Sequence, residues 1–590
     1  MPPRLIALAC SLIVATSFAA SPRLSTIAEK SGFKRTGRFA EVVRLCADFE
    51  RAWPKQVRCF EFGTSPQGRP LLALAVSADG TLDATTAHEK QRTVVLMQGG
   101  IHAGEIDGKD AGFLALREML EGRAAKDALR QATLVFVPVF NVDGHERFGR
   151  WNRPNQVGPE EMGWRTTAQN LNLNRDYTKA ETPEMQAMLQ LLEQWDPILL
   201  ADLHVTDGAE FEHDISINVE PTLVNDDPLT LTGEQLRDDL IERLAAQGSL
   251  PINFYPSLIE DDNPQSGFAV SPPLPRFSQP YWGKRNRLAV LVETHSWKDY
   301  PTRVRITRHT IIAMMELAAA QGHEWRRIAA AADASAAKIG GKPEPLTYEN
   351  TDHVIQIDFR GYAYTREPSA ISGSLVTRYD NRRPQVWHVP FKDELKPAIS
   401  VTAPRGGYIV PAEQALWLGE KLELHGIEFR RISEASAASE VQTFRATNVK
   451  LASSTFEGRT MLSVEGAWQP EKRDIPAGSL FVPIAQAKSH LLMALLEPQA
   501  PDSFLAWGYF NAAFERKEYL ESYVAEQVGS EMLQKNPALR EEFTRRLAED
   551  PQFARSPQAR LDFFYRRHES WDERVGLYPL YRVDDLPGTQ

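Results

Sequence analysis

Short apolar runs alternate with amphipathic segments between about residues 55 and 325, and this alternation limits the possible fold more than any other feature. Four runs are rich in Val, Ile and Leu, as strands are when both faces of a sheet are covered: 94–97, 134–140, 198–203 and 288–292. Four longer segments have helical periodicity: 109–120, 183–194, 231–246 and 303–320. The sequence therefore predicts an α/β fold with a mixed, mainly parallel, doubly wound sheet and helices on both faces.

Different patterns flank this region. Residues 57–62 and 71–76, joined by a Pro- and Gly-containing turn, predict an antiparallel hairpin at the sheet edge. An Ala-rich helix at 324–338 and the glycines that follow it mark a domain boundary. We therefore predict an α/β domain at 21–343, a β-rich accessory domain at 344–485 with one helix at 411–425, and a helical C-terminal region at 486–590.

The first 20 residues have the pattern of a secretory signal peptide. Arg4 precedes an apolar run at 5–14, and small residues around Ala19 and Ala20 offer a cleavage site. The alternative is a membrane anchor, but a spanning helix needs about 20 apolar residues and this run is shorter. The pattern predicts a periplasmic or secreted protein with no membrane span after cleavage.

Charge and cysteine content narrow the class further. The 590 residues include 67 basic and 78 acidic side chains, a net charge of −11, which argues against a nucleic-acid partner. Cys46 and Cys59 would remain after cleavage. In an oxidising compartment they either form a disulfide or remain as two small buried thiols. Two thiols are too few for a Cys-rich zinc site.

Ionisable residues stand where three of the predicted inner strands end. The first strand runs into the glycine-flanked pair His102 and Glu105, the second into His204, and the third into Glu293. Ligand sites of open α/β sheets form beyond the carboxyl ends of the strands. We therefore expect these four side chains to meet in one crevice.

Two imidazoles and one carboxylate are a known ligand set for catalytic zinc. His102, Glu105 and His204 are thus predicted to bind one Zn²⁺ per chain, which lowers the pKa of water toward neutrality. Glu293 fits the separate general base that such a site needs. Its alternative is an exposed charge at a strand end. A second His-x-x-Glu match, at 425–428, has no glycine approach and is interpreted as structural.

The connection after Phe140 is long and dense in Arg and Asn, which suits recognition of a carboxylate. With its neighbours it resembles the zinc carboxypeptidase family of the carboxypeptidase A type, over about residues 35–325. The residues that carry the resemblance, in the family's order, are His102, Glu105, Asn174, Arg175, His204 and Glu293.

The resemblance implies a role for each of these residues. His102, Glu105 and His204 would hold zinc, and Glu293 would activate water and later protonate the leaving amine. Asn174 and Arg175 would bind the free carboxylate of the substrate's last residue. Two arginines compete for the oxyanion, with Arg153 as the first choice and Arg165 as the second, and Tyr281 is the candidate for a tyrosine that caps the substrate.

The sequence also departs from the family pattern. Asn172 stands where the family often has an Asp that bonds the first zinc histidine; Asn still accepts that hydrogen bond but adds less charge. Asp207 and Glu210 follow His204 closely, so the pocket is expected to be acidic. If Asp207 faces substrate, basic or amino-bearing groups would be favoured.

Three functions compete at this point. The first is an exported zinc metallocarboxypeptidase that acts on peptides or cell-wall peptides. The second is a zinc-dependent deacylase or amidase acting on acyl amino acids or cell-wall peptides, because an amino-acid carboxylate would also suit Asn174 and Arg175. The third is a catalytically silent binding module. Side-chain preference, exo- or endo-action and oligomeric state stay open.

Overall fold

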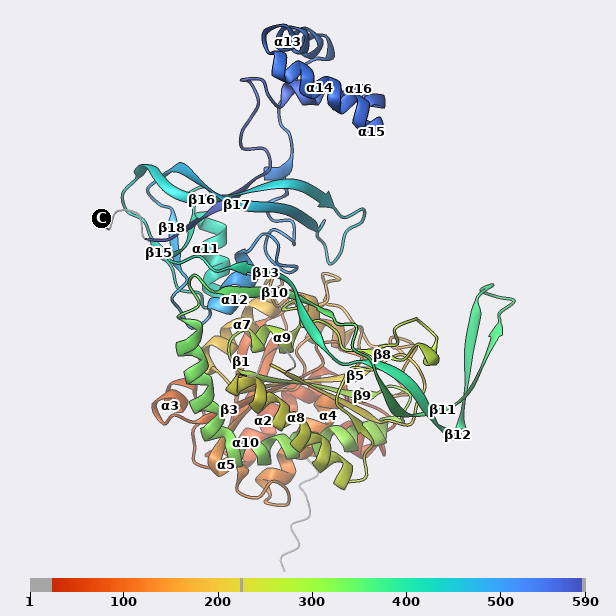
Figure 1. Ribbon diagram of the computed structural model, residues 1–590. Coiled ribbons are helices and arrows are strands. Elements are labelled where there is room, and N and C mark those ends of the chain that lie inside the picture. Colours follow the sequence, from red (N-terminus) through yellow and green to blue (C-terminus); the bar gives the residue numbers. More distant parts are fainter. Residues whose placement is uncertain (1–23, 223–226, 586–590) are drawn as a thin grey trace, which may run out of the picture.

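The computed structural model describes residues 24–222 and 227–585, so the predicted signal peptide lies outside the described residues. An eight-stranded mixed sheet forms the centre of the N-terminal half, with strand order β1-β2-β4-β3-β5-β9-β6-β7 (Figure 1). Its strands are β1 (Val57–Thr64), β2 (Pro70–Val76), β3 (Thr93–Gly99), β4 (Ala132–Val137), β5 (Leu199–Thr206), β6 (Ile215–Glu220), β7 (Pro251–Ile252) and β9 (Leu288–His295).

The four predicted inner strands are confirmed as β3, β4, β5 and β9. They are adjacent and parallel to one another, and every residue of each is buried, which explains their unbroken apolar runs. β1 and β2 form the predicted antiparallel edge, and β6 runs antiparallel to β9. The predicted mixed α/β sheet is therefore confirmed. Because β3, β5 and β9 run in the same direction, their carboxyl ends meet at one edge.

Helices cover both faces of the sheet. One face packs against α2 (Phe39–Ala52), α4 (Asp107–Leu120), α8 (Pro228–Ala246) and α10 (Tyr300–Ala336). The other face packs against α7 (Pro183–Trp195) and α9 (Ser278–Gly283), and that apolar core continues into the C-terminal half. The two helices predicted at 303–320 and 324–338 are one helix, α10.

The C-terminal half is β-rich. β10 (Pro343–Asn350) pairs with β13 (Leu395–Thr402), and the long hairpin of β11 (Ile355–Pro368) and β12 (Leu375–Lys392) adds to β8 (Phe268–Ala269). A six-stranded sheet has the order β15-β18-β14-β19-β16-β17. Its strands are β14 (Gly407–Val410), β15 (Arg430–Arg431), β16 (Ser436–Leu451), β17 (Leu462–Ile475), β18 (Leu480–Pro483) and β19 (Leu577–Val583), and α11 (Ala415–Leu424) is its helix.

The C-terminal region contributes one strand to the six-stranded sheet and also forms several helices. Near the end of the described chain, β19 returns to pair with β14 and β16, so the final segment completes the accessory sheet. Before it come α12 (Ser489–Leu496), the 3-10 helix η3 (Asn511–Phe514), and the helices α13 (Ser522–Lys535), α14 (Pro537–Glu549), α15 (Pro551–Arg555) and α16 (Pro557–Tyr565). Helices α13 to α16 form a small bundle that stands away from the rest (Figure 1).

Cys46 of α2 and Cys59 of β1 form a disulfide, so of the two alternatives for these residues the structure contains the paired one. Between residues 24 and 222 and between 227 and 585, no helix has both the length and the apolar character needed to cross a bilayer.

Candidate metal centre

A tight glycine-containing loop after β3 carries the first two predicted ligands. Gly100 has a φ of +63°, a left-handed conformation that favours glycine. A Cβ on Gly104 would lie only 2.5 Å from Arg153 Cγ, so glycine is also needed for close packing there. The loop therefore places His102 and Glu105 at the end of β3, beside the end of β5.

The structure brings His102, Glu105 and His204 together. All three are buried, and one ligand atom from each lies within 4.8 Å of the others. His102 Nδ1 lies 3.0 Å from Glu105 Oε1, and His204 Nδ1 lies 2.9 Å from Glu105 Oε2. Both imidazoles thus direct Nδ1 toward the same carboxylate. Two nitrogens and a carboxylate that converge on one point fit a zinc ion with room for a further ligand.

The outer nitrogens of the two histidines have different partners. His102 Nε2 donates to Asn172 Oδ1 at 3.0 Å, which is the hydrogen bond expected of Asn172 from the sequence. His204 Nε2 lies 2.9 Å from Asp202 Oδ2, and Ser278 Oγ donates to the same oxygen at 2.6 Å. The charged partner thus stands behind the second histidine rather than the first. Asp202 was not predicted as this partner, although residues two apart on a strand share a face.

The electrostatic surroundings favour the protonation states that a metal ion requires at His102 and Glu105. Burial lowers the pKa of His102 to about 4, which keeps this imidazole neutral. Burial alone would raise the pKa of Glu105, but Arg153, His102 and His204 together hold it well below its usual range. A neutral histidine and an ionised carboxylate are the forms that bind a cation. At His204 burial alone would lower the pKa, but Asp202, Glu105 and Glu293 raise it well above its usual value, so a metal ion would have to displace a proton there.

Glu293 lies on β9 directly across from His204 of β5 in the strand register. It is 6% exposed, and its Oε2 has no hydrogen-bond partner among the described residues. Burial, reinforced by the charges of Glu105 and Asp202, raises the pKa of Glu293. A buried carboxyl group beside the ligand cluster, with a raised proton affinity and a free oxygen, is suited to accept a proton.

A cavity of about 440 Å³ opens over the cluster and is lined by most of the predicted site residues. Arg153 and Arg165 both line it. Arg153 Nη1 lies 2.8 Å from Glu105 Oε1, and the Arg153 side chain is 9% exposed. Arg165 Nη1 lies 3.4 Å from the same oxygen, and the Arg165 side chain is 38% exposed. Arg153 Nη2 also donates to the Val205 carbonyl at 3.1 Å. Arg153 is therefore the deeper and better fixed of the two positive charges.

Asn174 and Arg175 also line the cavity, and both lie in the 3-10 helix η1 (Leu173–Arg175). Asn174 Oδ1 accepts a hydrogen bond from the Ser278 amide at 3.2 Å. The Arg175 guanidinium stacks 4.4 Å from the ring centre of Phe277. Burial, followed by the like charges of Arg165 and Arg276, lowers the pKa of Arg175 to about 10. This crowding of positive charge favours an anionic ligand.

The structure does not bring Tyr281 to the cavity, which corrects the expectation that it caps the substrate. Tyr281 is fully buried on α9, and its hydroxyl donates to His425 Nδ1 at 2.9 Å. Its place in chain order suited the role, but its ring belongs to the apolar core. The tyrosine that lines the cavity is Tyr255, whose hydroxyl lies 3.4 Å from Thr206 Oγ1. No sequence pattern around Tyr255 marked it.

A protein-family model matches the part of the chain that carries the three clustered residues. Residues 42–213 match the model of the zinc carboxypeptidase family, so this segment is a zinc carboxypeptidase domain that includes His102, Glu105 and His204. Glu293 lies beyond the matched residues. The family binds zinc, and the His-Glu-His cluster is compatible with a metal site. No curated protein matches the sequence.

Solved metallo-carboxypeptidases are among the similar structures. One from Pseudomonas aeruginosa is 20% identical, with 48% of this chain and 69% of that chain covered and a TM-score of 0.34. A putative carboxypeptidase A from Shewanella denitrificans is 16% identical, with 47% and 68% covered and a TM-score of 0.36. Carboxypeptidase A from Helicoverpa armigera is 17% identical, with 51% and 75% covered and a TM-score of 0.34.

Proposed function

We propose that the chain is an exported, zinc-dependent metallocarboxypeptidase that hydrolyses the C-terminal peptide bond of peptides or cell-wall peptides. One observation carries this proposal. The cluster of His102, Glu105 and His204 lies beside Glu293, in a cavity that Asn174 and Arg175 also line. A metal-binding cluster, a free buried carboxyl group and a carboxylate-binding pair in one cavity are the parts that C-terminal hydrolysis requires.

Each part has a chemical task. When bound, zinc supplies a Lewis acid that polarises a carbonyl group and acidifies water. Glu293 takes the proton from the attacking water and returns it to the leaving amine, because its free oxygen and raised pKa suit both transfers. Arg153 places a fixed positive charge near the carbonyl oxygen, where negative charge develops.

Export rests on separate observations. The N-terminal residues have the signal-peptide pattern, and Cys46 and Cys59 are paired. Disulfides persist in oxidising compartments and are rare in the cytosol, so the pair supports a periplasmic or secreted location. Such a location would also supply cell-wall peptides.

The test compares peptides with a free C-terminal carboxylate against the same peptides with a C-terminal amide. We expect the wild type to cleave the free acids and Arg175→Met to raise their KM about 10- to 100-fold, because a charge-assisted hydrogen bond is lost. Arg150→Met, in the same connection but exposed, is the control and should behave as wild type. Equal wild-type cleavage of acids and amides would contradict C-terminal recognition. Cleavage of acyl amino acids but not of peptides would favour the deacylase alternative.

Asp207 also lines the cavity, and the residue is exposed. We expect Asp207→Asn to lower kcat/KM about two- to fivefold for peptides ending in Lys, and to leave peptides ending in Leu unchanged, since an exposed ion pair contributes little. Glu210→Gln is the control, because Glu210 instead accepts a hydrogen bond from Asn381 Nδ2 at 2.7 Å. An unchanged ranking of substrates in Asp207→Asn would remove Asp207 from substrate selection.

A further inference from the structure

The long hairpin of β16 and β17 ends against the α/β domain (Figure 1). At its tip, Phe456 and Arg459 exchange backbone hydrogen bonds of 2.8 and 3.0 Å around Glu457 and Gly458. We call residues 456–459 the tip turn. Both central residues are left-handed, with φ of +48° at Glu457 and +78° at Gly458. A two-residue turn of this kind favours Asn or Gly at both positions, so a glutamate at 457 is costly for the backbone.

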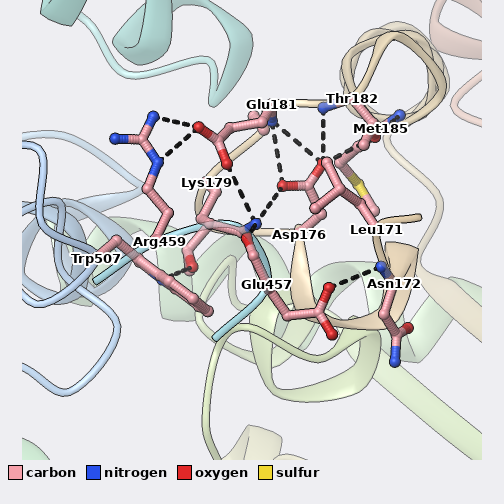
Figure 2. Close-up of polar contacts among 12 residues, drawn as sticks. Leu171, Asn172, Asp176, Lys179, Glu181, Thr182, Met185, Glu457, Arg459 and Trp507 are labelled. Carbon is pink, nitrogen blue, oxygen red and sulfur yellow. Dashed lines mark hydrogen bonds and ion pairs between the residues drawn. The ribbon is translucent and has the colours of Figure 1, made fainter. Parts of the chain in front are cut away.

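The Glu457 side chain reaches the loop that carries the site residues. Its Oε2 accepts a hydrogen bond from the Asn172 backbone amide at 2.8 Å (Figure 2). Its backbone carbonyl accepts from Lys179 Nζ at 3.1 Å. Residues 172–182, which we call the docked segment, begin at Asn172 and contain Asn174 and Arg175. The tip turn thus contacts the same stretch of chain that lines the cavity.

Other residues of the C-terminal half hold the rest of the docked segment. Trp507 Nε1 donates to Thr178 Oγ1, and the Trp507 ring stacks on Phe456 and lies 5.0 Å from Lys179 Nζ. The remaining polar contacts are His425 Nε2 to Thr178 O at 3.1 Å, Tyr509 Oη to Lys179 O at 3.3 Å, Lys421 Nζ to Ala180 O at 2.7 Å and Arg459 Nε to Glu181 Oε1 at 2.8 Å. The C-terminal half therefore supplies partners for the Asn172 amide and for three consecutive backbone carbonyls, at residues 178–180.

The hydrogen bond between Glu457 and the Asn172 amide connects the tip turn to the metal centre. The Asn172 amide is held by Glu457, while its side-chain oxygen accepts from His102 Nε2 at 3.0 Å and from the Asn174 amide at 2.9 Å. One asparagine therefore links the tip turn to a zinc ligand and to the carboxylate-binding pair. Outer partners of this kind fix the orientation of a metal-binding imidazole.

We propose that Glu457 is a positioning residue of the active site, and that the accessory hairpin is a structural part of the metal centre rather than a separate module. This inference rests on the proposed function. Glu457 acts through Asn172: it fixes the backbone from which Asn172 orients His102 and Asn174. The backbone cost of a left-handed glutamate is offset by this contact.

The test is the zinc affinity of the full chain with Glu457→Gly. Glycine removes the carboxylate and at the same time relieves the left-handed backbone, so the turn itself is not weakened. We expect the zinc Kd, measured by competition with a chelating dye, to rise about tenfold, and kcat/KM to fall in parallel. Glu457→Gln keeps one acceptor oxygen for the Asn172 amide and should recover most of the zinc affinity.

Glu440→Ala is the matched control. Glu440 lies on the same hairpin, its side chain is 87% exposed, and its Oε1 lies 3.8 Å from Lys472 Nζ. The zinc Kd of Glu440→Ala should therefore equal that of the wild type. A wild-type zinc Kd in Glu457→Gly would overturn the inference, because a merely structural contact changes stability and not metal affinity. Loss of the cooperative thermal transition in Glu457→Gly would leave the decision to Glu457→Asn, whose side chain suits the left-handed turn but is one methylene too short for the Asn172 amide; a wild-type zinc Kd in that variant would overturn the inference. Failure of the wild type to trim peptides would reject the proposed function and leave the zinc comparison intact.

Discussion

Glu293→Gln is expected to lower kcat by about 10³-fold while the protein still binds one zinc per chain. The carboxyl group has a free oxygen, lies beside the ligand cluster and is not one of its three members. The glutamine side chain has nearly the same shape as glutamate but cannot accept and return a proton. General acid–base catalysis contributes about 10²- to 10⁴-fold to the rate. Steady-state kinetics and elemental analysis of the same preparation measure both quantities.

Glu220→Gln provides the control for this substitution. Glu220 lines the same cavity from the neighbouring strand β6, and burial raises its pKa to about 8. A general change in the charge of the cavity would therefore affect both variants, whereas loss of the base affects only Glu293→Gln. A kcat within about threefold of wild type in Glu293→Gln would show that another group moves the proton.

Arg303→Met is expected to lower the free energy of unfolding by about 3–5 kcal/mol, because it leaves a buried charge without its partner. Arg303 lies fully buried in α10, and its Nε donates to Asp107 Oδ2 at 2.8 Å. Its other nitrogens donate to the carbonyls of Val157 at 2.7 Å and Gly158 at 2.9 Å. Asp107 Oδ2 also accepts a hydrogen bond from Thr294 Oγ1, and Thr294 is next to Glu293 in β9. The ion pair therefore also contacts the strand that carries Glu293.

Urea denaturation followed by tryptophan fluorescence measures this loss. Arg327→Met is the control: Arg327 lies in the same helix but pairs with Glu324 at the surface, where both side chains are more than half exposed. We expect no measurable shift for the control. An equally small shift for Arg303→Met would mean that water or another residue compensates Asp107, and that the ion pair is not needed for the fold.

The sequence was sufficient for the central sheet and for the ligand cluster. β3, β5 and β9 are buried on both faces, so their apolar runs stand out. His204 and Glu293 follow such runs directly, and His102 follows after a short glycine-containing loop. One helix was wrongly divided near Gly322. Gly322 lies inside this continuous helix, and a Cβ there would lie 2.3 Å from Thr93 Cγ2, so the glycine permits close packing on β3 and does not end the helix.

The features that were missed depend on contacts between distant parts of the chain. Glu457 meets Asn172 across 285 positions, and no periodic pattern records such a pairing. β19 joins its sheet from near the end of the chain. Tyr281 has the chain position that the resemblance implied, but its ring is buried against His425, and Tyr255 lies at the cavity instead. Local patterns predict elements and strand ends, whereas side-chain partners follow from tertiary packing.

The most direct test of the proposed zinc-dependent carboxypeptidase activity measures the metal content of the wild-type protein together with its trimming of peptides. We expect one zinc per chain, release of single C-terminal residues from free-acid peptides in mass spectra, loss of this activity after chelation, and its recovery on addition of zinc. A protein without zinc, or one that trims peptides equally well after chelation, would contradict the proposal.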